Sequence, residues 1–597
     1  MRFPSIQRLT SSARQTAARF PFVLGAAVIA TVAGILTIEH ANHPIWERAE
    51  LSAVLGIPLL LALALWAERR GWHGRRRIGV GVGGALVLLS FFLLWPGWSQ
   101  SVGWTRFWQL SIAFHLLVAF LPYAGRNEPN GFWQYNRALL LRAVTAGLFS
   151  LVLWTGLAIA LRAVEVLFGM DIPGERYGQA MVVLFFLFNT WFFLGGVPRD
   201  FAALERSEDY PAEVKVFTQY VLLPIVTVYI AILTAYMVKV IVTWEWPSGW
   251  IGWLVSGVAA AGILALLLVH PVRGREENRW VGSYARWFWI ASLPAVVMLW
   301  LAIWQRVDQY GVTEPRYFLT ILSIWLAAIA LYYTLRGSQR IILIPASLCV
   351  LALATFAGPW SPYSTSLRSQ THRLEEVLTR NGMLDEGTIR QASTAVEFLD
   401  RREINAILRY LLETHGTGSI ADWFGGQLAA IDSSGTGPSR SGEAEERVRL
   451  IVAHLGIGYV DRWQRGTEEQ FNYFARQTAE PIPIADYDYA LQLDGLLNES
   501  IHVADDVELA YDSVATEVRL VSAGETLISV PLLPLLERAA AHQPAEGDEA
   551  IPRDSLRAAG ENDAARIAIY VTALTGVRSE SGPVLSSLSA TAYVRIK

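Results

Sequence analysis

Long apolar segments alternate with short polar ones through the first 360 residues of the chain. A bilayer core of about 30 Å requires about 20 apolar residues in one helix. The pattern predicts about eleven transmembrane helices, with a range of ten to twelve because the second, fourth and eleventh segments are short. The segments lie at about 20–38, 51–67, 78–95, 107–123, 139–161, 180–197, 216–241, 251–269, 287–304, 316–334 and 341–357.

The basic residues between these segments predict the orientation of the helices. Loops on the same side as the N-terminus hold 21 Lys and Arg, whereas the loops on the other side hold 7. Cytoplasmic loops carry the excess of Lys and Arg in membrane proteins. We therefore expect a cytoplasmic N-terminus and a periplasmic region after the last helix. The first apolar segment lacks a small-x-small cleavage site, which favours an uncleaved helix over a signal peptide.

The remaining residues, 361–597, differ in charge and in hydrophobic period. Residues 1–360 have a net charge of +10, and residues 361–597 have a net charge of −14. Helical spacing continues to about residue 455, and from about residue 486 the apolar positions alternate, which is typical of strands. The predicted fold is a polytopic α-helical membrane protein with a C-terminal extramembrane α+β domain that contains an antiparallel sheet. We expect a bundle at 1–360, a helical extramembrane region at 361–445 and the α+β domain at 446–597.

The joint between the ninth and tenth apolar segments, "YGVTEPRYFL" at 310–319, has the pattern of a helix start. Gly311 permits a turn, Thr313 suits the N-cap, and Glu314 and Pro315 suit the first turn. The joint lies on the side where the C-terminal region leaves the membrane, so we expect it to help seat that region. The charged residues that could pair across the joint are Arg306, Asp308, Glu314 and Arg316.

Several stretches resemble one family of bacterial proteins. They are "YGVTEPRYFLTILSIW", "YVLLPIVTVYIAILTAYMVKV", "FWQYNRALLLR" and "GPWSPYSTSLRSQ". The chain resembles the polytopic inner-membrane proteins grouped as domain of unknown function 4153, from about Asn136 to the region near 487–494. The resemblance implies a location in the inner membrane. It brings no established activity and no catalytic residue.

Polar groups at membrane depth are candidate functional residues. His115 lies in the middle of the fourth segment, and its helix face is mostly small or polar, so we expect it to point into the bundle as a structural histidine rather than a proton or substrate ligand. Asn189 is expected to form an interhelical hydrogen bond. Tyr229 and Tyr236 lie on one helix face with Lys239. Packing is the favoured role of the two tyrosines, and snorkelling to the outer surface is the favoured role of Lys239.

The first outer loop holds Glu39, His40 and His43. An acidic residue after the first helix, many spans and an external C-terminal domain are also features of glycosyltransferases that use lipid-linked sugars, although their first outer loop is longer. This leaves Glu39 and His115 as weak catalytic candidates. The spacing of His40 and His43 is not that of zinc proteases, so these residues are weak metal candidates in a solvated loop.

Other classes of function find no support in the sequence. No phosphate-binding loop, nucleophile elbow or dinucleotide fingerprint occurs, so we expect no cofactor. The acidic C-terminal region disfavours nucleic acid as a partner. The leading hypothesis is a non-enzymatic envelope protein for sensing, binding, assembly or transport, with membrane lipids and other envelope proteins as partners. The alternative is a membrane enzyme that acts on a lipid-linked substrate at the outer face.

Overall fold

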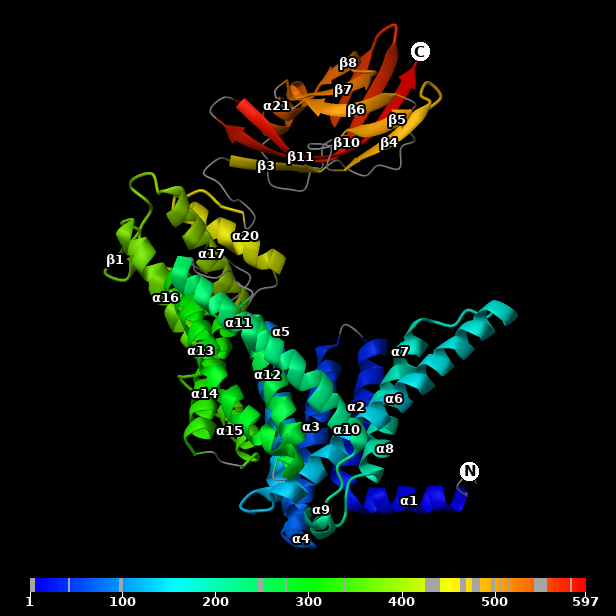
Figure 1. Ribbon diagram of the computed structural model, residues 1–597. Helices are drawn as coiled ribbons and strands as arrows, with labels where there is room; N and C mark the ends of the chain where they lie inside the picture. The colour runs from blue at the N-terminus through cyan, green and yellow to red at the C-terminus, as the bar shows by residue number, and fades with distance from the viewer. Residues whose placement is uncertain are drawn as a thin grey trace. The chain divides into compact units, whose positions relative to one another are not determined.

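The computed structural model describes most of the chain (Figure 1). The described residues are 6–40, 43–95, 100–243, 251–273, 276–336, 340–424, 441–461, 469–474, 484–494, 500–504, 506–512, 515–541, 556–579 and 582–597. They form two compact units. The first contains residues 1–393 and 407–456, and the second contains residues 394–406 and 457–597.

The first unit begins with five helices: α1 (Ile6–Arg19), α2 (Pro21–Glu39), α3 (Pro44–Arg69), α4 (Arg75–Leu94) and α5 (Gln100–Phe120). Helix α1 lies across the end of the bundle, whereas α2 and α3 run along it (Figure 1). The buried face of α2 is made almost entirely of small residues, among them Ala26, Ala30 and Gly34. Small residues let neighbouring membrane helices approach closely, which explains the tight packing of α2 on α3.

The middle of the bundle contains longer and irregular helices. Helix α6 (Pro129–Phe168) has 40 residues. A π-helical segment interrupts each of the next two long helices. The first of these helices consists of α7 (Glu175–Val182), the π-helical η3 (Val183–Phe188) and α8 (Asn189–Gly195). The second long helix follows the short α9 (Phe201–Arg206). It consists of α10 (Ala212–Val216), the π-helical η4 (Phe217–Leu222) and α11 (Leu223–Thr243).

The last helices of the bundle are α12 (Ile251–Val269), α13 (Arg279–Tyr310), α14 (Glu314–Arg336) and α15 (Leu343–Ala354). Helix α15 packs on α5, where Gln109 Nε2 donates hydrogen bonds to the carbonyl oxygen of Ala352 at 2.8 Å and to Thr355 Oγ1 at 3.0 Å. This contact joins the beginning of the bundle to its end.

Each of the eleven predicted apolar segments coincides with a helix. Among the described residues, nine helices are long and apolar enough to cross a membrane, which does not confirm the predicted count of eleven. Helix α15 has 12 residues, about 18 Å of rise, which is shorter than a bilayer core. Helix α5 contains Arg106, Gln109 and His115, which lower its hydropathy.

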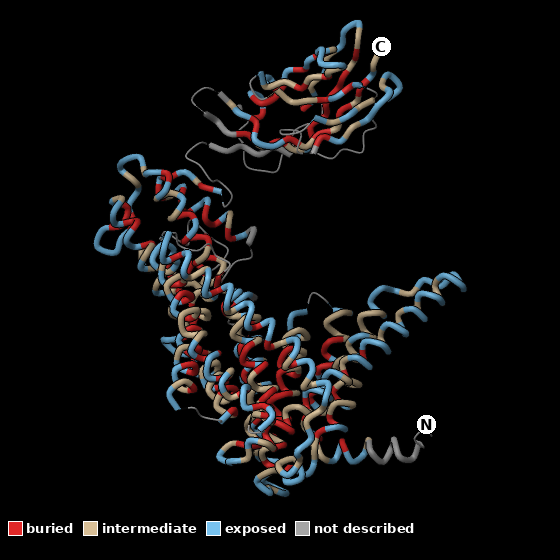
Figure 2. The backbone as a smooth tube through the Cα atoms, in the orientation of Figure 1, coloured by how far each residue is buried: buried red, intermediate tan, exposed pale blue. Residues whose placement is uncertain are grey.

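The buried positions of the bundle lie where helices meet, and large apolar side chains remain exposed on the outer sides (Figure 2). Helix α6 alone exposes Val144, Val152, Ile159 and Val166 by more than 60%. Soluble proteins rarely expose a continuous apolar surface of this kind, so this distribution is that of a multi-pass membrane protein.

Further helices follow the bundle within the first unit. They are α16 (Pro362–Arg380), the part of α17 (Phe398–Thr414) from Ile407 onward, α18 (Ala421–Phe424) and α20 (Ser441–His454), with the small hairpin β1 (Leu384–Asp385) and β2 (Thr388–Ile389). We call α16, α17 and α20 the C-terminal helices. Helix α16 begins at Ser361, whose Oγ accepts a hydrogen bond from the backbone N–H of Ser364 at 3.2 Å.

The described residues of the second unit form two antiparallel sheets. One has the order β3-β10-β11-β4, with β9 also paired to β10, and the other has the order β5-β6-β7-β8. The strands are β3 (Glu469–Phe474), β4 (Tyr489–Asp494), β5 (Ile501–Ala504), β6 (Val507–Asp512), β7 (Glu517–Ser522), β8 (Glu525–Pro531), β9 (Arg557–Glu561), β10 (Ala565–Ser579) and β11 (Gly582–Ile596). Helix α21 (Leu533–Ala541) follows β8.

One hydrophobic core joins the two sheets and α21. The alternation predicted for the last strand is confirmed, because Leu588, Ala590, Ala592 and Val594 are buried in this core. The sheet-containing C-terminal region predicted from the sequence is therefore present.

Candidate functional site

The joint between α13 and α14 is where the C-terminal helices contact the bundle. Gly311 has φ of +69°, which favours glycine. A Cβ atom at this position would lie 2.7 Å from both Arg373 Cδ and Gln370 Nε2, so glycine also allows α16 to approach closely. Helix α14 begins at Glu314, as the sequence predicts. The residues of this joint thus form a turn that fits against α16.

Three side chains of α16 bind backbone atoms of the joint. Gln370 Nε2 donates to the carbonyl oxygens of Tyr310 at 3.0 Å and Val312 at 3.1 Å. The N–H of Val312 donates to Ser369 Oγ at 2.9 Å. Arg373 donates to the carbonyl oxygens of Asp308 and Gln309, at 2.9 Å and 2.8 Å. Because Gln370 is only 3% exposed, its two hydrogen bonds satisfy polar atoms that water does not reach.

The carboxylate of Glu314 lies at the centre of a polar cluster. Ser366 Oγ of α16 and Tyr410 Oη of α17 each donate a hydrogen bond to Glu314 Oε1 at 2.7 Å. His415 Nε2 lies 3.4 Å from Ser366 Oγ, and the His415 ring contacts those of Tyr363 and Tyr410. We call Glu314, Tyr363, Ser366, Tyr410 and His415 the Glu314 cluster. It joins α14 to α16 and to the end of α17.

Burial shifts the pKa values of the tyrosine and histidine side chains in the cluster. It raises the pKa of Tyr363 to about 12 and that of Tyr410 further. Burial also lowers the pKa of His415, while the nearby Glu314 carboxylate opposes that shift. Desolvation disfavours the charged form of each group, so the tyrosines and the histidine are neutral around pH 7. The carboxylate of Glu314 therefore has neutral hydrogen-bond donors around it.

The cluster contains serine, histidine and glutamate, but its geometry is that of a structural contact. Ser366 has no exposed surface, and its hydroxyl group donates to Glu314 rather than to histidine. A nucleophilic serine requires a base to accept its proton and space for a substrate carbonyl. The arrangement suits the joining of helices by a charge-assisted hydrogen-bond network.

The other charged residues of the joint are placed differently from the prediction. Arg316 Nη1 donates to the carbonyl oxygens of Tyr310 and Gly311, and no ion pair links Arg306, Asp308, Glu314 and Arg316 within the described residues. The pairing that the sequence allows across the joint is thus not found among these described residues. Glu314 and Arg316 are two residues apart on a helix, so they face nearly opposite directions. Asp308 contributes its backbone carbonyl group, and Arg306 is exposed.

His115 does not point into the bundle, which corrects the prediction from its helix face. It is exposed, and its Nδ1 contacts the carbonyl oxygen of Ser111 in the same helix at 2.7 Å. The opposite face of α5 is the packed one, with Phe107, Ala113 and Phe114 in a buried cluster. Aromatic and apolar packing therefore determined the rotation of α5.

The candidates in the loop between α2 and α3 lie at the surface. Glu39 is exposed, and its Oε1 accepts a hydrogen bond from Gln179 at 2.9 Å and lies 3.8 Å from Arg176. His40 and His43 are exposed, with ring centroids 6.2 Å apart. In the described part of the chain, no group of three or more His, Cys, Asp and Glu could hold a metal ion.

The remaining candidates lie on α8 and α11. Asn189 is half-buried, and its Oδ1 has no hydrogen-bond partner among the described residues, so the expected interhelical bond does not form there. Tyr229 is 43% exposed, whereas Tyr236 packs on a buried cluster around Leu299. Lys239 is exposed. Packing thus accounts for Tyr236 but not for Tyr229.

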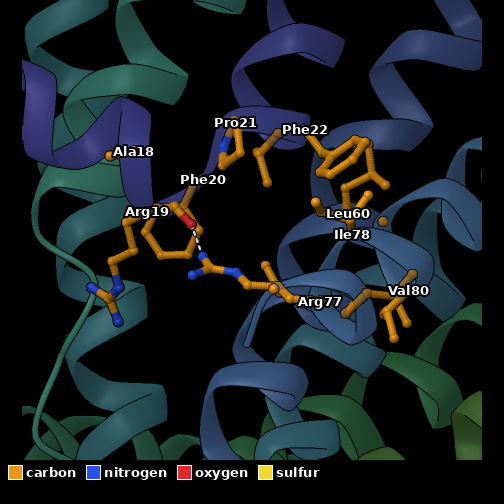
Figure 3. A pocket seen from close by; sticks show the side chains of 14 residues that line it. Ala18, Arg19, Phe20, Pro21, Phe22, Leu60, Arg77, Ile78 and Val80 are labelled. Carbon is orange, nitrogen blue, oxygen red and sulfur yellow. Dashed lines mark hydrogen bonds between the residues drawn. The ribbon is translucent and has the colours of Figure 1, made fainter. Parts of the chain in front are cut away.

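A cavity of about 260 Å³ lies beside the junction of α1 and α2 (Figure 3). Arg77 points toward the main chain there and donates a hydrogen bond to the carbonyl oxygen of Arg19. The guanidinium group of Arg19 points away from the cavity and binds Glu68 at 3.0 Å and the carbonyl oxygen of Val197 at 2.8 Å. Both arginines hold helices together at this junction.

Sequence reasoning missed the partners of Glu314. Tyr363, Ser366, Gln370 and Arg373 follow 3-4-3 spacing in "SPYSTSLRSQTHR", so they form one polar face of α16. That spacing indicates from the sequence alone that α16 has a polar face for contact with another element. Tyr410 and His415 gave no such signal, because only the fold brings α17 to Glu314.

Comparisons with known proteins agree with the resemblance seen in the sequence. The family model described as Domain of unknown function (DUF4153) matches residues 24–392. The matched region begins earlier and ends earlier than the expected one. An uncharacterized protein of Pasteurella multocida (strain Pm70), PM1469, is 23% identical over 346 residues, which cover 56% of each chain. No solved structure matches.

Proposed function

Since the chain belongs to the DUF4153 family, whose description assigns no activity, we propose that it is a non-enzymatic inner-membrane protein of the bacterial envelope. In this proposal the bundle holds the C-terminal helices at the periplasmic face. These helices and the sheet-containing unit bind or assemble with a partner there. Membrane lipids and other envelope proteins are the proposed partners.

The Glu314 cluster is the observation that carries the proposal. A single carboxylate accepts hydrogen bonds from both α16 and α17, and three side chains of α16 bind the adjacent backbone. Hydrogen bonds to a charged group contribute about 1.5–3 kcal/mol each. Such a network favours a fixed attachment of the C-terminal helices over a flexible tether, and a fixed attachment suits a protein that presents a binding surface.

The proposed topology has eleven crossings, with the N-terminus in the cytoplasm and the C-terminus in the periplasm. The loops with 21 basic residues against 7 support this orientation. The proposed division is a bundle at 1–360, a helical extramembrane region at 361–445 and an α+β domain at 446–597. Alkaline phosphatase fused after Lys597 is expected to be active and green fluorescent protein fused there to be dark. The reverse pair of results would contradict the topology.

The exposure of Glu39 weakens the alternative of an enzyme acting on a lipid-linked substrate. Such an enzyme needs an acidic or histidine pair in a lipid-accessible cavity, whereas Glu39 binds Gln179 at the surface. His115 is also exposed, and its Nδ1 contacts the carbonyl oxygen of Ser111 in its own helix. Neither residue offers a partner for acid–base catalysis in this geometry.

Complementation of a deletion strain tests the proposal. Glu314→Ala is expected to impair envelope integrity, whereas Glu39→Gln and His115→Gln are expected to complement as well as the unmodified chain. The lipid composition of the deletion strain is expected to show no accumulated lipid-linked intermediate. An accumulated intermediate that the Glu39→Gln strain reproduces would contradict the proposal and favour the enzyme.

A further inference from the structure

A second cavity, of about 480 Å³, lies between the end of α12, the start of α13 and α14. Three arginines and a serine line it, and two stacked aromatic rings form its buried side. Those rings, Trp289 and Tyr333, have centroids 5.0 Å apart at an angle of 12°, and they are 5% and 7% exposed. The polar lining residues are Arg273, Arg279, Ser283 and Arg286.

The sequence places these groups on one side of the cavity. Arg279, Ser283 and Arg286 follow 4-3 spacing on α13, so their side chains share one helix face. Arg273 approaches from the chain segment after α12, and its Nε lies 3.8 Å from where a Cβ atom at Gly282 would be. The three guanidinium groups thus converge from two segments of the chain.

The positive charge of the cavity is largely uncompensated. Arg279 pairs with Glu276 at 3.1 Å, but both side chains are more than 80% exposed, and such a pair is weak. Within the described ranges, no carboxylate forms an ion pair with Arg273 or Arg286. Burial lowers the pKa of Arg273, because the half-buried guanidinium group has lost water. A bound anion would restore the interactions that Arg273 has lost.

The depth of the cavity fits a lipid headgroup. From Arg286 to Tyr310, α13 rises about 36 Å, which slightly exceeds a bilayer core of about 30 Å. Tyr310 belongs to the joint that binds α16, so Arg286 lies near the opposite surface of the membrane. Trp280 and Trp287 beside the cavity are exposed, as is typical of aromatic residues at a membrane interface.

We propose that this cavity binds the phosphate group of an anionic phospholipid. Guanidinium groups bind phosphate through paired hydrogen bonds, and Ser283 adds a hydroxyl donor. The acyl chains would lie along the exposed apolar surface of α13, which includes Trp287 and Ile290. With the orientation proposed above, the lipid belongs to the cytoplasmic leaflet. The site is independent of the Glu314 cluster. The cavity in Figure 3 is different, because its two arginines already bind groups of the protein.

Native mass spectrometry of the purified full chain tests the site. Phosphatidylglycerol is titrated against phosphatidylcholine as the neutral lipid and glycerol phosphate as the soluble headgroup. Arg273→Gln and Arg286→Gln are each expected to weaken phosphatidylglycerol binding about fivefold, and the double variant further. Arg206→Gln is the matched control, since Arg206 is exposed and outside the cavity, and binding should not change.

Ser283→Ala provides a variant without a change in charge, and a smaller loss of phosphatidylglycerol affinity is expected from it. Phosphatidylcholine is expected to bind all variants equally. The proposal is overturned if the arginine and Ser283 variants bind phosphatidylglycerol as tightly as the control. It is also overturned if glycerol phosphate binds as tightly as phosphatidylglycerol, because the ligand would then be a soluble phosphate compound.

Discussion

Tyr410 Oη donates a hydrogen bond to Glu314 Oε1 over 2.7 Å, although 96 residues separate the two along the chain. Tyr410 belongs to α17, and Glu314 is the first residue of α14. The carboxylate lies at the N-terminus of its helix, where the helix dipole also stabilises negative charge. The contact therefore stabilises the position of α17 and the start of α14 together.

A double-mutant cycle measures this contact. Tyr410→Phe is expected to lower the free energy of opening α17 by about 1.5–3 kcal/mol, because it removes a hydrogen bond to a charged group. In a Glu314→Gln background the same change should cost clearly less. Hydrogen exchange of residues 398–414 in lipid nanodiscs provides the measurement. Tyr229→Phe, at an exposed tyrosine of α11, is the control, and additive effects at 314 and 410 would refute the coupling.

The seating of the C-terminal helices is expected to weaken in mild acid. His415 faces Glu314 of α14, Tyr363 of α16 and Tyr410 of α17, and burial lowers its pKa. The unfolded state, with an ordinary histidine pKa of about 6.5, then binds more protons than the folded state as the pH falls. The contribution of His415 is complete above about pH 6.5 and is lost as the pH falls toward its folded pKa.

Hydrogen exchange of α16 and α17 between pH 7.5 and 5.5, corrected for the intrinsic rate, checks this dependence. His415→Asn cannot titrate in this range and is expected to flatten the curve. An equally steep pH dependence in His415→Asn would assign the effect to another group.

Gly311→Ala is expected to loosen α16 from the joint. At φ of +69° and ψ of 179°, a conformation used almost only by glycine, the new Cβ atom would be strained by about 1–3 kcal/mol, and it would displace Gln370 from its two carbonyl partners. Gly71→Ala is the matched control, because Gly71 has φ of +67° with nothing within 4 Å. Exchange of residues 362–380 should rise only in Gly311→Ala. Equal exchange in both variants would contradict the close contact of Gly311 with α16.

Substitutions at His115 are expected to be nearly silent. Its Nδ1 contacts the carbonyl oxygen of its own helix, and its side chain is exposed. Both His115→Gln and His115→Leu should keep the thermal stability of the purified protein within about 0.5 kcal/mol. A large loss in His115→Leu alone would instead support the inward-pointing structural histidine that the sequence suggested.

Local patterns predicted the helices of the bundle, the start of α14 and the last strands, because apolar period and capping act over a few residues. They failed where packing between distant segments determines which face of a helix is buried or which residues come into contact. The polar face around His115 indicated the wrong rotation of α5, since Phe107 and Phe114 on the other face pack better. Glu314 was identified, but its partners lie 52 and 96 residues away, and no local pattern specifies such a contact.

The contact between the joint and α16 is the central element of this account, and disulfide formation tests it most directly. The N–H of Val312 lies 2.9 Å from Ser369 Oγ, so cysteines at 312 and 369 in a Cys349→Ala background should form a disulfide in native membranes. Cysteines at 312 and 379 are the control, because ten residues along α16 add about 15 Å. Efficient crosslinking of the first pair but not of the second is the predicted result. Absence of crosslinking at 369 in folded protein, or equal crosslinking at 379, would contradict the fixed seating of the C-terminal helices on the bundle.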